Sequence, residues 1–155
     1  MAARLDLAVL VRGDDVLSCV VSGFVEPWRV ESAAQNRAAH AATAALAREY
    51  ARGGFPVLID TVLGPWHRDA FLTALDLPCR YIVLRPDRQT TIDRAAGRGP
   101  GALTDVETVG FMWDQFADLG ELEQHTIDTT RLSVEETADA VLAAGPETLL
   151  ERPTI

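Results

Sequence analysis

Short apolar runs alternate along this chain with longer stretches in which apolar and polar residues recur at the spacing of a helix. Four runs predict strands, and each ends in polar or turn-forming residues: 7–11, 56–60, 80–84 and 125–128. Five longer stretches predict helices: 32–52, 66–75, 87–97, 104–119 and 133 to about 145. Because strands that alternate with helices form βαβ units, the pattern predicts an α/β fold with a mostly parallel sheet covered by helices on both faces.

The ends of the predicted helices carry local signals. Residues 32–52 are rich in alanine, the best helix former, and stop at Gly53-Gly54. Thr104 and Glu107 have the spacing of a capping box, so we expect the helix that follows to begin at this threonine. Ser133 opens the last predicted helix.

Length and composition fit one globular domain. The chain has 155 residues, of which 48% are hydrophobic and 24% charged, so we expect a single domain over residues 1–155, with its core at about 4–144 and a frayed tail at 145–155. The net charge of −9 argues against nonspecific nucleic-acid binding and against docking on an anionic membrane. No apolar run approaches the roughly 18 residues of a membrane span, and the N-terminus lacks the pattern of a signal peptide. Cys19 and Cys79 lie on apolar stretches without metal-ligand spacing, so we interpret them as small core residues and expect a cytoplasmic protein.

Carboxylates follow the first two predicted strands. In parallel sheets the ligand site lies beyond the carboxyl ends of the strands, where Asp14, Asp15 and Asp60 are expected, with Arg85 and residues 128–130 after the later strands. Asp60 could hold magnesium through water, or it could cap a turn. Asp14 and Asp15 could supply a general base or accept a hydrogen bond from a ligand, or they could lie in a solvated turn.

Two arginines and two tryptophans are further candidates. Arg94 and Arg98 are four residues apart, beside the glycine-rich segment 97–101. This spacing is typical of a mobile lid whose guanidinium groups pair with phosphate oxygens. It is equally typical of an ordinary pair of surface arginines. Trp28 and Trp66 follow prolines in loops, where they could line a ligand pocket or pack in the core. The three histidines, His40, His67 and His125, have no metal-ligand spacing, and we interpret them as structural or surface residues.

Several stretches of the chain belong to one recognisable pattern: Gly13-Asp14-Asp15, Ser22 to Trp28, Glu31-Ser32, Gln35-Asn36, Gly53 to Asp60, Gly64-Pro65-Trp66, Leu84-Arg85-Pro86, Arg94, Arg98, Asp128-Thr129-Thr130, Leu132-Ser133 and Glu135-Glu136-Thr137. Together they resemble the small P-loop kinases, the group of the nucleoside-monophosphate, shikimate and gluconate kinases. The likeness is greatest to the chloramphenicol phosphotransferase-like proteins and to the AAA-type proteins described as ATP-binding and kinase-like. The resemblance spans roughly residues 4–144. The Pro-Trp and Gly-Pro-Trp elements are its more specific parts, whereas the carboxylates and arginines are generic.

The resemblance implies a phosphotransferase that uses ATP and Mg²⁺ to phosphorylate a hydroxyl group of a small molecule. It implies Asp14 as the base, with Asp15 able to share that role, and Asp60 as the residue that holds magnesium through water. It implies Arg94 and Arg98 as phosphate ligands. Asp128 and Thr129 would lie on the nucleotide side, and Trp28, Glu31, Asn36 and Trp66 would line the acceptor pocket.

The sequence departs from this family at its most important motif. It contains no Gly-x-x-x-x-Gly-Lys-Ser/Thr, and all fourteen basic residues are arginine, so no lysine can neutralise the β- and γ-phosphates. About 25 to 30 residues of the family pattern (a strand, the phosphate loop and most of a helix) precede the point where the chain begins. We expect a fold truncated at its N-terminus, a seam where the central strand is missing, and weak or no ATP binding.

Three functions stay open at this point. The chain is a fragment or degenerate form of an ATP-dependent small-molecule kinase, or it is a non-catalytic binding or regulatory module of the same fold. The third possibility, another doubly wound binding domain such as a flavodoxin-like one, rests only on the generic alternation of strands and helices. The acceptor and the oligomeric state are left open.

Overall fold

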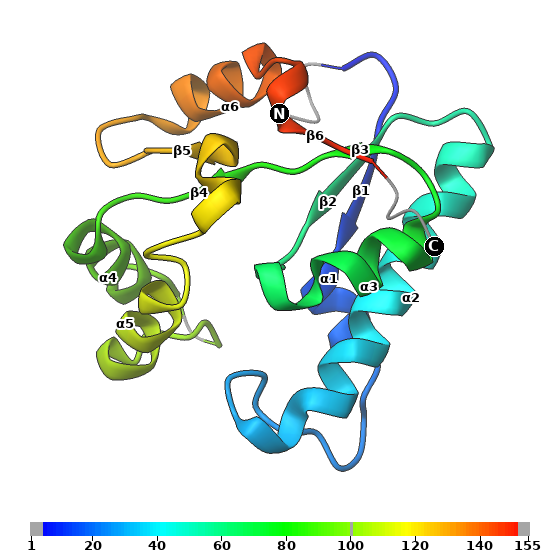
Figure 1. Ribbon diagram of the computed structural model, residues 1–155. Helices are drawn as coiled ribbons and strands as arrows, with labels where there is room; N and C mark the ends of the chain where they lie inside the picture. The colour runs from blue at the N-terminus through cyan, green and yellow to red at the C-terminus, as the bar shows by residue number, and fades with distance from the viewer. Residues whose placement is uncertain (1–4, 100, 152–155) are drawn as a thin grey trace. The chain divides into compact units, whose positions relative to one another are not determined.

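The computed structural model describes residues 5–99 and 101–151 (Figure 1). The chain divides into two compact units, and among these residues the first consists of 5–79 with 150–151 and the second of 80–149. Within the described ranges, no helix is both long enough and apolar enough to cross a membrane.

The first unit is built on a parallel pair of strands. Its elements are β1 (Val9–Arg12), α1 (Gly13–Leu17), η2 (Val30–Ser32), α2 (Ala33–Arg52), β2 (Val57–Asp60) and α3 (Pro65–Leu75). Strands β1 and β2 pair so that Val9 lies opposite Val57 and Arg12 lies opposite Asp60. Helix α2 belongs to the crossover that connects them, as parallel strands require.

Helices α2 and α3 lie side by side in the first unit (Figure 1). Ala44 and Ala47 of α2 are almost fully buried, as are Phe71 and Leu72 of α3. Alanine leaves room for the larger side chains of the neighbouring helix, so the alanine-rich sequence serves packing as well as helix propensity. Near its end, α2 is held to α3 by Arg48, which donates to the Ala74 carbonyl at 3.0 Å.

The second unit contains a shorter parallel pair. Its elements are β4 (Val83–Leu84), α4 (Arg88–Ala96), α5 (Val106–Asp114), η3 (Gly120–His125), β5 (Thr126–Ile127), α6 (Val134–Ala143) and η4 (Pro146–Thr148). In the pair β4–β5, Val83 lies opposite Thr126 and Leu84 opposite Ile127. Side chains of α4 and α5, namely Ile92, Ala95 and Val109, form a small core with Leu103.

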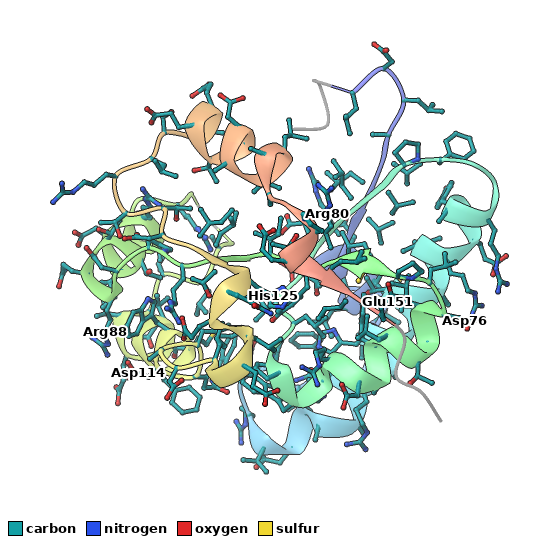
Figure 2. The ribbon with its side chains drawn as sticks, turned by 45° about the horizontal axis from the view of Figure 1, so that its top comes forward. Asp76, Arg80, Arg88, Asp114, His125 and Glu151 are labelled. Carbon is teal, nitrogen blue, oxygen red and sulfur yellow. The ribbon has the colours of Figure 1, made fainter. Side chains whose placement is uncertain are left out.

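Close approaches and buried hydrogen bonds fix the second unit locally. Gly110 has no side chain, which leaves room for the Arg88 guanidinium, and Arg88 forms an ion pair with Asp114 at 3.0 Å (Figure 2). His125 is 1% exposed, and its Nδ1 lies 3.0 Å from the Tyr81 carbonyl oxygen. Because a carbonyl oxygen can only accept a hydrogen bond, the Nδ1 of His125 is the protonated nitrogen and donates to Tyr81.

Most predicted elements are confirmed. The strands at 7–11 and 56–60 and the helices at 32–52, 66–75 and 87–97 each match an observed element to within a few residues. The helix opened by Ser133 is also confirmed: the Ser133 hydroxyl accepts from the Glu136 amide at 3.1 Å, and the Glu136 carboxylate accepts from the Ser133 amide at 2.8 Å. These helices were predictable because their end signals are local.

Several of the sequence predictions are wrong in detail. The strand predicted at 80–84 is two short strands, β3 (Cys79–Arg80) and β4, and β3 pairs with β6 (Leu149–Leu150). In the tail predicted to fray at 145–155, residues 146–150 instead form η4 and β6, and residues 152–155 lie outside the described ranges. The Cys19 side chain is exposed rather than buried, whereas Cys79 is half-buried and its burial raises the pKa of the thiol to about 11.

The helix predicted at 104–119 is shorter at both ends. It spans Val106–Asp114, and its N-cap is Asp105, whose carboxylate accepts from the Thr108 amide at 2.8 Å. Thr104 is therefore not the cap, because an aspartate one residue later takes that position. At the other end, the Arg85 guanidinium donates to the carbonyls of Phe116 and Ala117 at 2.7 and 3.3 Å. These two residues therefore bind a side chain from outside the helix and lie beyond its end at Asp114.

The α/β class with parallel strand pairs is confirmed, but a continuous sheet is not observed. Among the residues described, the strands form three separate two-stranded sheets: β1–β2, β3–β6 and β4–β5. The membership in the P-loop group stays a prediction.

The contact at Gly13 generates a stability prediction. A Cβ at Gly13 would overlap the hydroxyl and Cβ of Thr61, so Gly13→Ala should cost about 1–3 kcal/mol of unfolding free energy by overpacking. The gain from alanine in a helix is about 0.5–1 kcal/mol, so the net effect is destabilising. Urea unfolding measures it. Gly99→Ala is the control, because a Cβ there meets no atom within 4 Å, and equal stability of the two variants would contradict the close approach.

Candidate functional site

Three carboxylates lie at one edge of the β1–β2 pair. Asp60 is the last residue of β2, and in the parallel register it lies opposite Arg12, the last residue of β1. Asp14 and Asp15 follow directly in the first turn of α1, and all three aspartates are exposed. The backbone therefore places the three aspartates beyond the carboxyl ends of β1 and β2, as the sequence predicted.

The β1–α1 turn and the segment after β2 approach each other closely. Gly13 is buried, and only its missing side chain leaves room for Thr61, the residue after Asp60. This contact ties the start of α1 to the end of β2, so Asp14 and Asp60 are carried by backbone segments that touch.

The donor set at this edge fits magnesium only in part. Mg²⁺ is usually bound by one or two carboxylates together with water and the substrate's phosphates, and Asp60 has the right chemistry for a ligand through water. In the described part of the chain, no group of three or more histidine, cysteine, aspartate or glutamate side chains could hold a metal ion by itself. A phosphate-bearing partner would have to supply the remaining ligands.

The start of α2 holds the loop that carries the predicted acceptor residues. The Gln35 side chain accepts from the Val25 amide at 2.9 Å and donates to the Val25 carbonyl at 2.6 Å. Asn36 donates from Nδ2 to the Pro27 carbonyl at 2.7 Å and to the Ser32 hydroxyl at 2.9 Å. The Asn36 Oδ1 is buried and has no hydrogen-bond partner among the residues described. Asn36 is thus a loop anchor with one acceptor atom still free.

The structure does not bring the predicted acceptor residues into one pocket. An open hollow of about 310 Å³ beside the loop is lined by Phe24, Val25, Glu26, Arg29 and Glu31. Of the four predicted residues, only Glu31 lines it. Trp28 is half-buried, and Trp66 is 53% exposed with its indole against Gly64.

Glu31 is kept ionised by its neighbours. A backbone N–H and the Arg29 side chain, whose Nε lies 3.4 Å from the Glu31 carboxylate, lower the pKa of Glu31. The carboxylate faces solvent, so this ion pair contributes little to stability.

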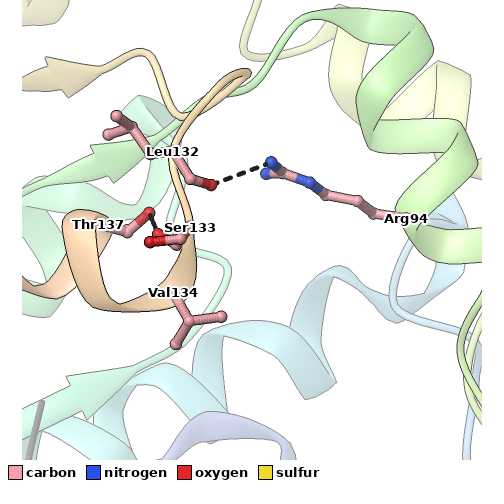
Figure 3. A pocket seen from close by; sticks show the side chains of 5 residues that line it. All are labelled: Arg94, Leu132, Ser133, Val134 and Thr137. Carbon is pink, nitrogen blue, oxygen red and sulfur yellow. Dashed lines mark hydrogen bonds between the residues drawn. The ribbon is translucent and has the colours of Figure 1, made fainter.

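Arg94, in the second unit, is already bound to the backbone. Its Nη2 donates to the carbonyls of Thr129, Thr130 and Leu132 at 2.9, 3.2 and 3.5 Å. It also lines an open hollow of about 420 Å³ together with Leu132, Ser133, Val134 and Thr137 (Figure 3). In this state Arg94 braces the turn after β5.

Arg98 differs from Arg94 in having a free guanidinium. It follows Gly97, the residue that ends α4, and it is exposed. No hydrogen bond or ion pair reaches its side chain from any residue in the described ranges. Of the two predicted phosphate ligands, Arg98 is the one whose charge is available.

Asp128 and Thr129 belong to a tightly bonded turn. The Asp128 carboxylate accepts from the Thr130 amide at 2.8 Å and from the Thr130 hydroxyl, and these bonds lower the pKa of Asp128. The Thr130 hydroxyl in turn accepts from the Asp87 amide at 2.8 Å, and Asp87 caps α4. Thr129 is buried, at 3% exposure. These contacts give both residues a structural role in linking β5 to α4.

Two pairings lie beyond what the sequence could show. Arg85 and Glu123 form a double ion pair, with Nη1–Oε1 and Nη2–Oε2 at 3.0 and 2.8 Å. The sequence placed Arg85 beyond the end of a strand, but nothing in the sequence indicated its partner. His40 and His67, interpreted separately as structural or surface residues, lie with their ring centroids 5.1 Å apart.

The predicted site residues fall into two sets. Asp14, Asp15, Trp28, Glu31, Asn36, Asp60 and Trp66 belong to the first unit, and Arg94, Arg98, Asp128 and Thr129 belong to the second. Comparison with known proteins adds no assignment, because no family model matches the chain and no curated protein matches it significantly.

The Arg85–Glu123 pair gives a pH-dependent prediction. The Arg85 hydrogen bonds, followed by the Leu119 amide, lower the pKa of Glu123 to about 2. A carboxyl pKa that is lower in the folded than in the unfolded chain stabilises the fold at pH values above the unfolded-state pKa of about 4.3. This stabilisation is lost as the pH falls through the folded-state pKa of about 2. Arg85→Gln should raise the Glu123 pKa toward about 4.3, as measured by carboxyl ¹³C NMR, and should destabilise the fold more at pH 7 than at pH 2.

Arg88→Gln is the matched control, because it removes an exposed ion pair with Asp114 and should leave the Glu123 titration unchanged. An unshifted Glu123 pKa in Arg85→Gln would contradict the assigned pairing.

Proposed function

We propose that this chain carries the acceptor side and the lid side of a phosphotransferase that uses Mg²⁺ and ATP to phosphorylate a hydroxyl group of a small molecule. The observation that supports this best is the parallel register of β1 and β2, which gathers Asp14, Asp15 and Asp60 at one edge. Phosphoryl transfer needs a residue that orients the nucleophile and takes its proton, and carboxylates that hold magnesium.

The roles follow from the accessibility of each group. Asp14 or Asp15 accepts the proton of the acceptor hydroxyl, since both carboxylates are exposed at the start of α1. Asp60 holds magnesium through water. Arg98 pairs with phosphate oxygens, for which its unpartnered guanidinium is suited.

Arg94 and the acceptor residues have supporting roles. Arg94 holds the turn 129–132 through its carbonyl contacts and, in this proposal, turns toward phosphate when nucleotide binds. Of the four predicted acceptor residues, Glu31 lines the open hollow and Trp66 offers an exposed ring, so these two are available to an acceptor. Asn36 holds the loop, and its unpaired Oδ1 is buried.

Neutralisation of the β- and γ-phosphates needs a group that these residues do not contain. The sequence has no lysine and no glycine-rich phosphate loop after a strand. Within the described residues the pairs β1–β2 and β4–β5 are not joined by strand pairing. We therefore expect the 155-residue chain alone to bind ATP weakly or not at all.

A second candidate is a non-catalytic binding or regulatory module of the same fold. The observation that favours it is the binding of Arg94 to three backbone carbonyls, which uses a predicted phosphate ligand for structure. Phosphoryl transfer distinguishes the two candidates.

The test is ATP-dependent phosphorylation of a panel of small hydroxyl compounds by the full-length product of the gene, with the 155-residue chain assayed in parallel. The proposal predicts Mg²⁺-ATP binding and transfer by a protein that includes a phosphate loop. Substitution of the base, Asp14→Asn or Asp15→Asn, should lower the rate about 10²–10⁴-fold. Asp60→Asn should raise the Mg²⁺ concentration needed for half-maximal rate.

Asp69→Asn, an exposed carboxylate on α3, is the control and should leave the rate unchanged. If the full-length product carries no phosphate loop and neither protein binds Mg²⁺-ATP, the kinase proposal is wrong and the binding module is favoured.

A further inference from the structure

The facing helices α2 and α3 bring two histidines together. His40 lies in α2 and His67 in the first turn of α3, and their ring centroids are 5.1 Å apart at an interplanar angle of 48°. Both side chains are half-buried. The Trp66 ring lies edge-on to His67, with the centroids 6.4 Å apart. The packing of α2 against α3 therefore holds the two imidazoles together, and both remain partly accessible to solvent.

A third basic group accompanies the pair. Arg37 precedes His40 by three residues on α2, a spacing that places both on one face of the helix. Arg37 is exposed, and no hydrogen bond or ion pair reaches its guanidinium from the residues in the described ranges. The arginine next to His67 on α3 behaves differently, since Arg68 is paired with Asp69 at 2.8 Å.

The electrostatic field at the pair is positive. Burial is the main cause of the lowered pKa of His40, and the charge of His67 adds to it. Burial likewise lowers the pKa of His67, and the Arg37 charge adds to it. Neither of these shifts has a carboxylate among its causes. The cluster therefore holds one permanent cation and two groups that can become cationic, and among the described residues none of the three forms an ion pair with a carboxylate.

An oxyanion is the ligand whose charge would complement these three basic groups. It would pair with the free guanidinium, accept hydrogen bonds from imidazole N–H groups and remove the repulsion that opposes their protonation. A divalent metal is the other ligand that two imidazoles suggest, but the Arg37 charge beside His67 opposes a second cation.

We propose that Arg37, His40 and His67 form a binding site for a small oxyanion, the phosphate or carboxylate group of a small molecule. Binding at this site needs neither ATP nor a phosphate loop. Combined with the proposed phosphotransferase activity, it would restrict the acceptor to hydroxyl compounds that also carry such a group. Only this extension depends on the proposed function.

The test is an NMR titration of the histidine Cε1–H signals of the 155-residue chain with inorganic phosphate, at constant ionic strength and in the presence of EDTA. Saturable shifts are expected for His40 and His67, together with a rise in both pKa values, because an anion favours the protonated imidazole. Acetate in place of phosphate tests whether a carboxylate suffices. His125 is the internal reference, since it is buried and bonded to the Tyr81 carbonyl.

Two arginine variants make the test specific. Arg37→Gln should weaken phosphate binding by about tenfold or more, because it removes a charge-assisted hydrogen bond. Arg68→Gln removes an arginine that is already paired with Asp69 and should leave binding unchanged.

Any of three results would overturn the proposal. The first is the absence of a saturable shift with both phosphate and acetate. The second is equal binding by the Arg37→Gln and wild-type chains. The third is a shift that occurs only with Zn²⁺ in the absence of EDTA, which would identify a metal site. None of these outcomes depends on phosphoryl transfer, so failure of this proposal is distinguishable from failure of the proposed function.

Discussion

The first unit depends on the register of the parallel pair β1–β2. Side chains alternate between the two faces of a strand, so a shift by one residue would turn the buried Val11 toward the opposite face. The observed register also sets Arg12 opposite Asp60 and allows Gly13 to approach Thr61. One backbone arrangement thus fixes the packing of the strands and the place where the carboxylates gather.

Helix α2 extends this constraint to the loops around it. Gln35 and Asn36 at its start hold the loop at residues 25–32, and small buried residues further along pack against α3. His40 lies between these regions and meets His67. The same helix therefore positions the candidate acceptor loop and the basic cluster, and a disturbance of its packing would affect both.

The parts of the fold that could be predicted are those set by local sequence. The alanine-rich run of α2, the apolar run of β2 and the Ser133–Glu136 capping box each contain their own signal. The end of α5 could not be predicted, because Arg85 binds the carbonyls that follow it from a distant part of the chain. Order in η4 and β6 was missed for the same reason, since β6 is a strand only by pairing with β3.

The candidate site divides in the same way. Its strand-end aspartates could be placed from sequence, because parallel topology brings the carboxyl ends of neighbouring strands together. The binding of Arg94 to carbonyls after β5 could not, because it depends on side-chain geometry. The meeting of His40 and His67 depends on how α2 and α3 pack, which no spacing in the sequence encodes.

The most direct test of the central claim is an NOE measurement on the isotope-labelled chain. Our account predicts a strong contact between the Gly13 Hα protons and the Thr61 side chain, together with cross-strand contacts in which Arg12 lies beside Asp60. A register shifted by one residue, antiparallel contacts, or the absence of the Gly13–Thr61 contact would contradict it.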